Sequence, residues 1–196
     1  TIEKLRSLGY LGGAAAPAPS GPLPDPKDMI AVYEQVNLAR SLVAQGRPGE
    51  ALSVLDSLRT ESPDALRIRA SSLVRLGRGE EGIQAYDDLL ARFPDSPERI
   101  EILEGRAMAA LVARKLDDAL TRTEDLIAAV PQRPNLRTLL GRVHEARGDQ
   151  ALALAALQEE VRLFPRSVPA LVALAAHHAA FGSRSDAEAA YRQALA

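Results

Sequence analysis

The chain has 196 residues, of which 46% are hydrophobic and 26% are charged, a balance typical of globular proteins. Its net charge of −2 provides no basic surplus for nucleic acid or an anionic membrane, so we expect neither as a partner. The absence of cysteine excludes disulfides, thiolate metal sites and cysteine nucleophiles, and no apolar run reaches the roughly 20 residues that span a bilayer.

The first 26 residues differ in character from the rest. Residues 1–10 (TIEKLRSLGY) predict a short helix that ends at Gly9, and residues 11–26 are rich in Gly, Ala and Pro, as linkers are. From about Lys27 the sequence has helical periodicity, and its abundant Ala and Leu favour helix over strand. We therefore expect two parts, 1–26 as helix and linker and 27–196 as one all-α array.

An internal repeat with a step of about 34 residues organises the second part. Prolines close apolar segments at Pro63, Pro94, Pro131 and Pro165, with spacings of 31, 37 and 34 residues. A very small residue stands twelve positions before each proline, and Ala187 continues this series of Ala51, Gly82, Ala119 and Ala153. Five positions before the small residues stand Gly46, Gly77, Arg114, Gly148 and Gly182.

This pattern is typical of stacked pairs of antiparallel helices. Glycine permits a tight turn between two helices, a small residue lets their axes approach closely, and proline ends the second helix. The expected helices are 29–45, 48–61, 64–76, 79–92, 97–113, 116–129, 134–147, 150–163, 168–181 and 184–195. The wide spacing before Pro131 predicts an extended helix near Asp95–Arg106, starting at Ser96-Pro97-Glu98.

The repeat resembles the tetratricopeptide repeat (TPR) family over about residues 28–196. The resemblance implies a right-handed superhelical α-solenoid of about five helical hairpins. A second small residue falls in each first helix, at Ala39, Ala70, Ala107, Gly141 and Ala175. The family's early aromatic is replaced by Gln35, Leu66, Leu103, Arg137 and Leu171. Thr123 and Glu160 stand at core positions of second helices, where we expect them to weaken packing.

A second resemblance concerns residues 1–30. The string EKLRSLGYLGG, a Pro/Ala linker and then DPKDMI resemble the tail of a bacterial sulfatase-type domain where it joins a repeat array. This implies an extracytoplasmic parent hydrolase, with the present chain as its C-terminal accessory or dimerisation module. The catalytic Cys/Ser-x-Pro-x-Arg motif of that family is absent from this sequence. We therefore expect the chain itself not to be an enzyme, and the compartment stays open.

Candidate catalytic and metal-binding groups have simpler explanations as helix positions. His177 and His178 are adjacent and point about 100° apart on a helix, which does not suit one metal ion. The carboxylate pairs Asp87-Asp88, Asp117-Asp118 and Glu159-Glu160 lie on second helices, which face mostly outward. No phosphate-binding or metalloprotease motif occurs. We expect no catalytic residue, no cofactor and no metal.

Partner binding is the function that the TPR resemblance implies. In that family the first helices line a concave groove that holds a peptide or partner helix. The matching positions here are Val36, Asn37, Arg40, Arg67, Ser71, Val74, Glu104, Met108, Leu111, Thr138, Arg142 and Glu145, followed by Val172 and Ala176. An apolar middle flanked by arginines predicts a protein or peptide with an apolar anchor and nearby acids. The chain's own upstream domain and a second copy of the chain are alternative partners.

Overall fold

The computed structural model describes residues 26–58 and 62–195, with side chains from Ile30 onward. The short helix and linker predicted for residues 1–25, and most of the sulfatase-like string, lie outside the described residues. Residues Gln35–Ala196 form one compact unit, and the packing below concerns that unit alone. The preceding unit, Thr1–Glu34, contributes the beginning of the first described helix.

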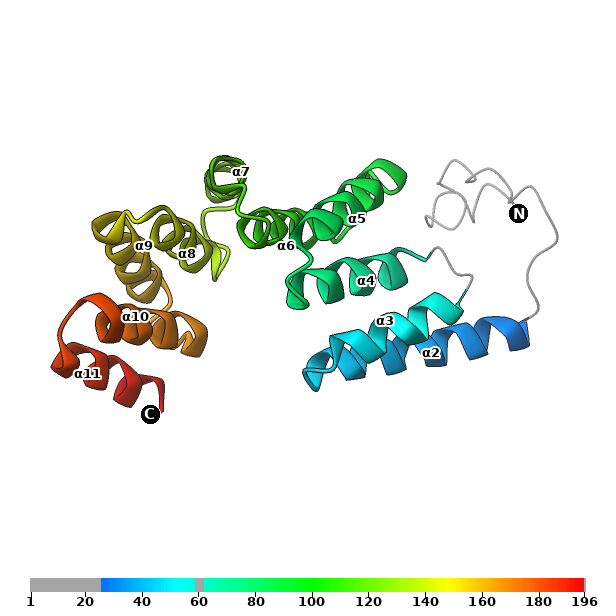
Figure 1. Cartoon of the computed structure of the whole chain (residues 1–196), viewed down its shortest axis with the longest axis horizontal. Coiled ribbons are helices and arrows are strands. Elements are labelled where there is room, and N and C mark those ends of the chain that lie inside the picture. Colours follow the sequence, from blue (N-terminus) through cyan, green and yellow to red (C-terminus); the bar gives the residue numbers. More distant parts are fainter. Residues whose placement is uncertain (1–25, 59–61, 196) are drawn as a thin grey trace, which may run out of the picture. The chain divides into compact units, whose positions relative to one another are not determined.

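The described residues form ten α-helices and no strand. The helices are α2 (Pro26–Ala44), α3 (Pro48–Ser57), α4 (Pro63–Arg75), α5 (Gly79–Arg92), α6 (Arg99–Val112), α7 (Leu116–Ala129), α8 (Leu136–Arg147), α9 (Gln150–Leu163), α10 (Val168–Phe181) and α11 (Arg184–Ala194). Figure 1 shows them following one another as antiparallel hairpins, so the predicted solenoid of helical hairpins is confirmed.

The turns inside the hairpins explain the repeated glycines. Gly46, Gly77 and Gly148 have φ angles of 76°, 77° and 88°, in the left-handed region where only glycine avoids a side-chain penalty. Arg114 occupies the same place in the third hairpin with φ 62°, although it carries a side chain. Gly182 does not follow this rule, since its φ is −121° and α10 ends there in a different turn.

The small residues of the repeat lie where paired helices touch. Ala51, Ala119 and Ala153 in second helices are fully buried, as are Ala39, Ala70, Ala107 and Ala175 in first helices. Neighbouring hairpins also approach closely at Gly79, the first residue of α5. A Cβ atom at Gly79 would lie 2.3 Å from the backbone nitrogen of Ala113, which directly follows α6. The backbones therefore meet at a distance that no side chain permits.

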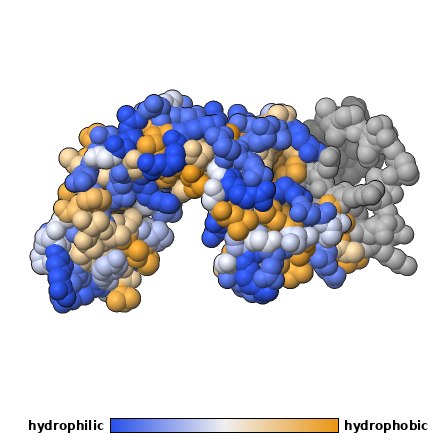
Figure 2. Space-filling view, viewed as in Figure 1, coloured by the Kyte–Doolittle hydropathy of each residue, from blue (hydrophilic) through white to orange (hydrophobic). Residues whose placement is uncertain are grey.

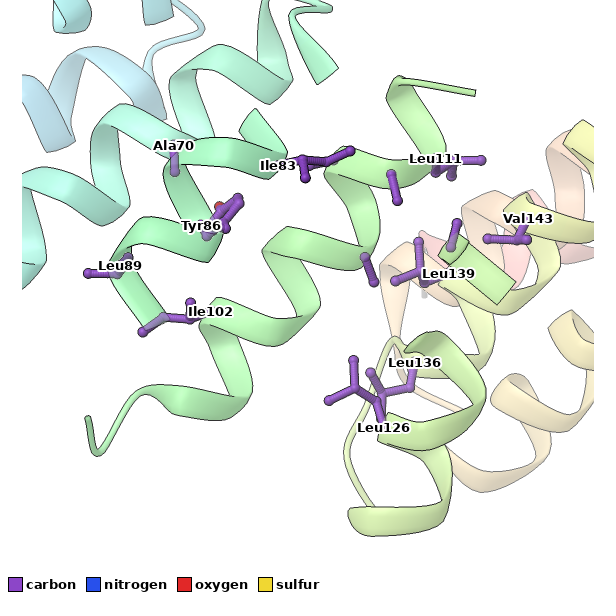
Figure 3. Packing of buried hydrophobic residues seen from close by; sticks show 14 residues of the cluster. Ala70, Ile83, Tyr86, Leu89, Ile102, Leu111, Leu126, Leu136, Leu139 and Val143 are labelled. Carbon is purple, nitrogen blue, oxygen red and sulfur yellow. The ribbon is translucent and has the colours of Figure 1, made fainter. Parts of the chain in front are cut away.

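The main core cluster runs from α4 to α8. Figure 3 shows its large side chains, among them Tyr86 and Leu89 of α5, Ile102 of α6 and Leu139 of α8. Burial raises the pKa of Tyr86 to about 12, because the phenolate would lose its hydration there. Each hairpin thus completes its core only by packing on its neighbours, as expected of a repeat array.

The predicted helix start at Ser96 is wrong, because the helix begins at Arg99. With 14 residues, α6 is longer than the neighbouring first helices α4 and α8, which have 13 and 12 residues. Residues 93–99 instead form a turn, in which the amide of Ser96 donates to the carbonyl of Phe93 and that of Arg99 donates to the carbonyl of Ser96. The turn before α8, residues 130–135, is as long as the turn before α6, residues 93–98. The additional residues of the wide proline spacing therefore lie in α6, which is two residues longer than α8, and in the turn that follows α6.

Thr123 and Glu160, the polar residues at core positions, are both buried, and both side chains have hydrogen-bond partners. The Thr123 hydroxyl donates to the carbonyl of Ala119 at 2.7 Å. The Glu160 side chain is fully buried in α9, and its carboxylate accepts the backbone N–H groups of Asn135 and Arg137 at 2.6 and 2.9 Å. Glu160 thereby caps the N-terminus of α8, where negative charge is favourable.

Candidate interaction surface

The helices are arranged in two layers with different contacts. Among the described elements, α4, α6, α8 and α10 contact one another in succession, while α5, α7, α9 and α11 contact only first helices. Side chains that project from consecutive first helices therefore belong to one continuous surface. We call this surface, with the predicted partner-binding residues of α2, α4, α6, α8 and α10, the first-helix face.

Most of the predicted residues reach the surface, but two do not. Val36 and Leu111 are only 4% and 9% exposed and pack in the core. The others are exposed or half-buried: Asn37, Arg40, Arg67, Ser71, Val74, Glu104, Met108, Thr138, Arg142, Glu145, Val172 and Ala176. A partner could contact this second group, whereas Val36 and Leu111 contribute packing between helices.

Ion pairs neutralise the first-helix face between α2 and α6. Arg40 of α2 contacts the carboxylate of Asp64 at 2.9 Å, and Arg67 of α4 contacts the same carboxylate at 3.0 Å. Arg67 also reaches Glu98, in the turn before α6, at 2.8 Å. These charges connect neighbouring hairpins, and a ligand would have to compete with partners that are already in place.

A second group of charges lies between α6 and α8. Arg133, in the turn before α8, lies 3.2 Å from a carboxylate oxygen of Glu101 and donates two hydrogen bonds to Glu104. Further along, Glu145 of α8 lies 2.8 Å from Nδ1 of His177, a buried side chain of α10. Glu104 and Glu145 are therefore engaged by the protein itself.

Arg142 differs from the other predicted arginines. It is exposed on α8, and its hydrogen bond within the described part of the chain goes to the sulfur of Met108 at 3.4 Å. A thioether is a weak acceptor and carries no charge. Among the described residues, Arg142 thus lacks the carboxylate partner that Arg40 and Arg67 have, and its charge is available to a ligand.

Beyond Arg142 the first-helix face becomes apolar. Val168, Val172, Ala176 and Ala179 of α10 lie on one side of the helix and are exposed, Val172 to 42%. No Asp, Glu, Lys or Arg occurs within α10, from Val168 to Phe181. Figure 2 shows orange and pale orange atoms at the surface of the α10–α11 end. Tyr191 of α11 and Leu195, which directly follows α11, are also exposed.

Sequence reasoning missed the partners of the predicted charges. Asp64 and Arg67 stand six and three residues before Ala70, the small residue of their first helix. Residues three apart are neighbours on a helix surface, so this spacing is a usable signal for a pair of charges. No such signal exists for Arg133 or His177, which approach their carboxylates from other segments.

The carboxylate pairs on second helices serve structural contacts. Arg106 of α6 is buried and makes ion pairs with Asp87 of α5 and Asp118 of α7. Although burial opposes it, hydrogen bonds from Arg106 and Arg122 lower the pKa of Asp118. Asp117 pairs with Arg147, and Glu159 pairs with Arg162. Within residues 30–58 and 62–195, no group of three or more His, Asp or Glu side chains could hold a metal ion.

A shallow cleft of about 400 Å³ lies on the side of the second helices, between α3 and α5. Leu52, Leu73 and Ala85 line it together with polar groups. Two arginines in the cleft, Arg69 and Arg78, already pair with Asp56 and Glu81. None of the predicted partner-binding residues lines this cleft.

The sequence profile of the tetratricopeptide repeat family matches residues 36–97 and 105–168, which together make up more than half of the chain. The chain belongs to the tetratricopeptide repeat family. The matched residues include α3, α4, α5, α7, α8 and α9 and the part of α6 from Gly105 onward. A comparison with curated proteins finds no match.

Solved structures show the same fold at low sequence identity. A thermophilic TPR protein from Thermus thermophilus is 22% identical, with a TM-score of 0.71 over 83% of this chain and 89% of that one. MamA from Desulfovibrio magneticus RS-1 is 19% identical, with a TM-score of 0.58 over 83% of this chain and 92% of that one. No described helix is both long enough and apolar enough to cross a bilayer.

Proposed function

We propose that the chain is a protein-interaction scaffold that holds a peptide or partner segment against its first-helix face. The observation that carries the proposal is the direct succession of contacts from α4 through α6 and α8 to α10. Because these helices touch one another, side chains at equivalent places in each repeat are presented side by side. Membership in the TPR family supports the same function, since such arrays present extended binding surfaces.

The chemistry of the face supports binding over catalysis. Apart from Arg142, the charged residues named on this face form ion pairs or hydrogen bonds with the protein, and α10 contributes an aliphatic surface. A preorganised surface lowers the cost of ordering on binding, because the protein side does not have to rearrange. The affinity would then come from a few well-placed contacts rather than from the whole area.

Site-specific photocrosslinking tests this function. A benzophenone side chain is placed at Met108 or at Ala176 on the first-helix face, and in matched controls at Glu124 or Ala128 on the exposed side of α7. The variants are irradiated in an extract of the organism that makes the protein. We expect protein adducts from the first-helix positions and none from α7. Equal labelling at both sets of positions, or none at either, would contradict the proposal.

A further inference from the structure

The charge distribution along the first-helix face changes at α8. Between α2 and α6, Arg40 and Arg67 are matched by carboxylates of the protein at 2.8–3.0 Å. Arg142, on α8, contacts only the uncharged sulfur of Met108 among the described residues. The other arginines of this surface are already paired with carboxylates. At Arg142 a ligand carboxylate can bind without displacing a carboxylate of the protein.

The neighbouring surface has the opposite character. Arg142 follows the small residue Gly141 in α8, and Ala176 follows the equivalent Ala175 in α10. Because α8 and α10 contact each other, the exposed stripe of Val168, Val172, Ala176 and Ala179 lies on the helix next to that of Arg142. The remaining charge of α8 on this side, Glu145, is occupied by the buried His177. The cation that α8 leaves without a carboxylate partner is therefore on the helix next to an uncharged aliphatic strip.

From this arrangement, which rests on the proposed scaffold function, we infer that the partner is a peptide segment with a carboxylate next to consecutive aliphatic residues. Its carboxylate pairs with Arg142, and its aliphatic side chains cover the stripe on α10. The charge-paired surface from α2 to α6 contributes little to the choice of partner. A basic segment is disfavoured, since it would bring like charge to Arg142 and bury its cations against valine and alanine.

The test uses a displayed library of random 12-residue peptides, panned against the whole chain. We expect the enriched peptides to share Asp or Glu beside two or more aliphatic residues. Affinities are then measured by fluorescence anisotropy for the wild type, Arg142→Gln, Arg142→Lys and Val172→Asp. We expect Arg142→Gln to weaken binding roughly tenfold or more, Arg142→Lys to retain part of it, and Val172→Asp to abolish it. The matched control, Arg162→Gln, replaces an exposed arginine of the second helix α9 and should bind as the wild type does.

Three outcomes would overturn the inference, and they separate it from the scaffold function. In the first, peptides are enriched but bind equally well to Arg142→Gln and Val172→Asp. The scaffold function would then stand, but the peptides would bind at another surface. In the second, light scattering shows that the wild type is a dimer and that Val172→Asp is a monomer. The stripe would then be covered by a second copy of the chain. Failure to enrich any peptide, together with no crosslinks in extract, would contradict the scaffold function as well.

Discussion

The middle of the array, α4 to α8, and the last hairpin, α10–α11, follow one repeat but are held together differently. The middle buries large side chains such as Tyr86, Leu89 and Ile102 and places Arg106 between two aspartates. In α11 the buried residues are Ala187 and Ala190, and the neighbouring α10 leaves valines exposed. One repeat register thus produces both a well-packed middle and an alanine-rich end that offers apolar surface to a partner.

The largest expected difference between the two regions concerns the first residue of a second helix. Gly79→Ala should destabilise the protein by about 3 kcal/mol, because its Cβ would collide with the backbone at Ala113. At the equivalent place in the last hairpin stands Arg184, which is largely exposed. Arg184→Ala should change the unfolding free energy by less than about 0.5 kcal/mol. Urea titration followed by circular dichroism measures both, and equal losses would contradict the comparison.

Glu160 lies in α9, between the two regions. Glu160→Ala should cost roughly 2–3 kcal/mol, because two backbone N–H groups at the start of α8 lose their acceptor. Its neighbour Glu159 pairs on the surface with Arg162, so Glu159→Ala is the matched control and should cost about 0.5 kcal/mol or less. If both variants melt at the same temperature, the cap does not contribute to stability.

Overpacking tests how rigidly each hairpin is held. Ala153→Leu should destabilise the protein by roughly 1–3 kcal/mol, since this fully buried alanine separates α9 from α8. Ala187→Leu makes the same change in α11. We expect it to cost less than half as much, because an end hairpin can shift outward. An equal cost in thermal melts would show that α11 is packed as firmly as the middle.

The left-handed turn at Arg114 offers a stabilising change. Arg114→Gly should raise the unfolding free energy by about 0.5–1 kcal/mol, because glycine adopts φ 62° without a side-chain penalty. The converse variant, Gly148→Ala at φ 88°, should lower it by about 1 kcal/mol. In the last hairpin Gly182 has a negative φ, so Gly182→Ala should lack this backbone penalty, and any loss should come from the new Cβ, which would lie 3.0 Å from Nδ1 of His178. Chemical denaturation distinguishes the three.

The smallest expected effect concerns the stability of the protein at low pH. The pKa of Asp118 is lower in the folded protein than the value of about 3.9 for an unfolded chain. Its carboxylate therefore adds stability above about pH 4, and this contribution is lost as the pH falls through the folded pKa. In Asp118→Asn, the free energy of unfolding should therefore decrease less steeply than in the wild type as the pH falls below about 4. Asp125→Asn, on an exposed position of the same helix, is the control and should leave the slope unchanged.

The fold could be predicted from the sequence more fully than the site, for identifiable reasons. Ala153 and Gly77 indicate a close contact and a turn by residue type alone, so hairpins and most helix limits could be located. The role of Glu160 could not be predicted, because one of its hydrogen-bond donors, the amide of Asn135, lies 25 residues away in another segment. Arg67 lies on a first helix, as its place in the repeat predicts, but its pairing with Glu98 depends on how hairpins stack.

The turn between α5 and α6 has a practical consequence. Residues 93–98 lie between α5, which ends at Arg92, and α6, which begins at Arg99, so this segment belongs to neither helix. A short reporter loop or affinity tag inserted after Asp95 would therefore leave the register of both flanking helices intact. The array could in this way carry a sensor close to Arg67 without disturbing the distant surface of α10.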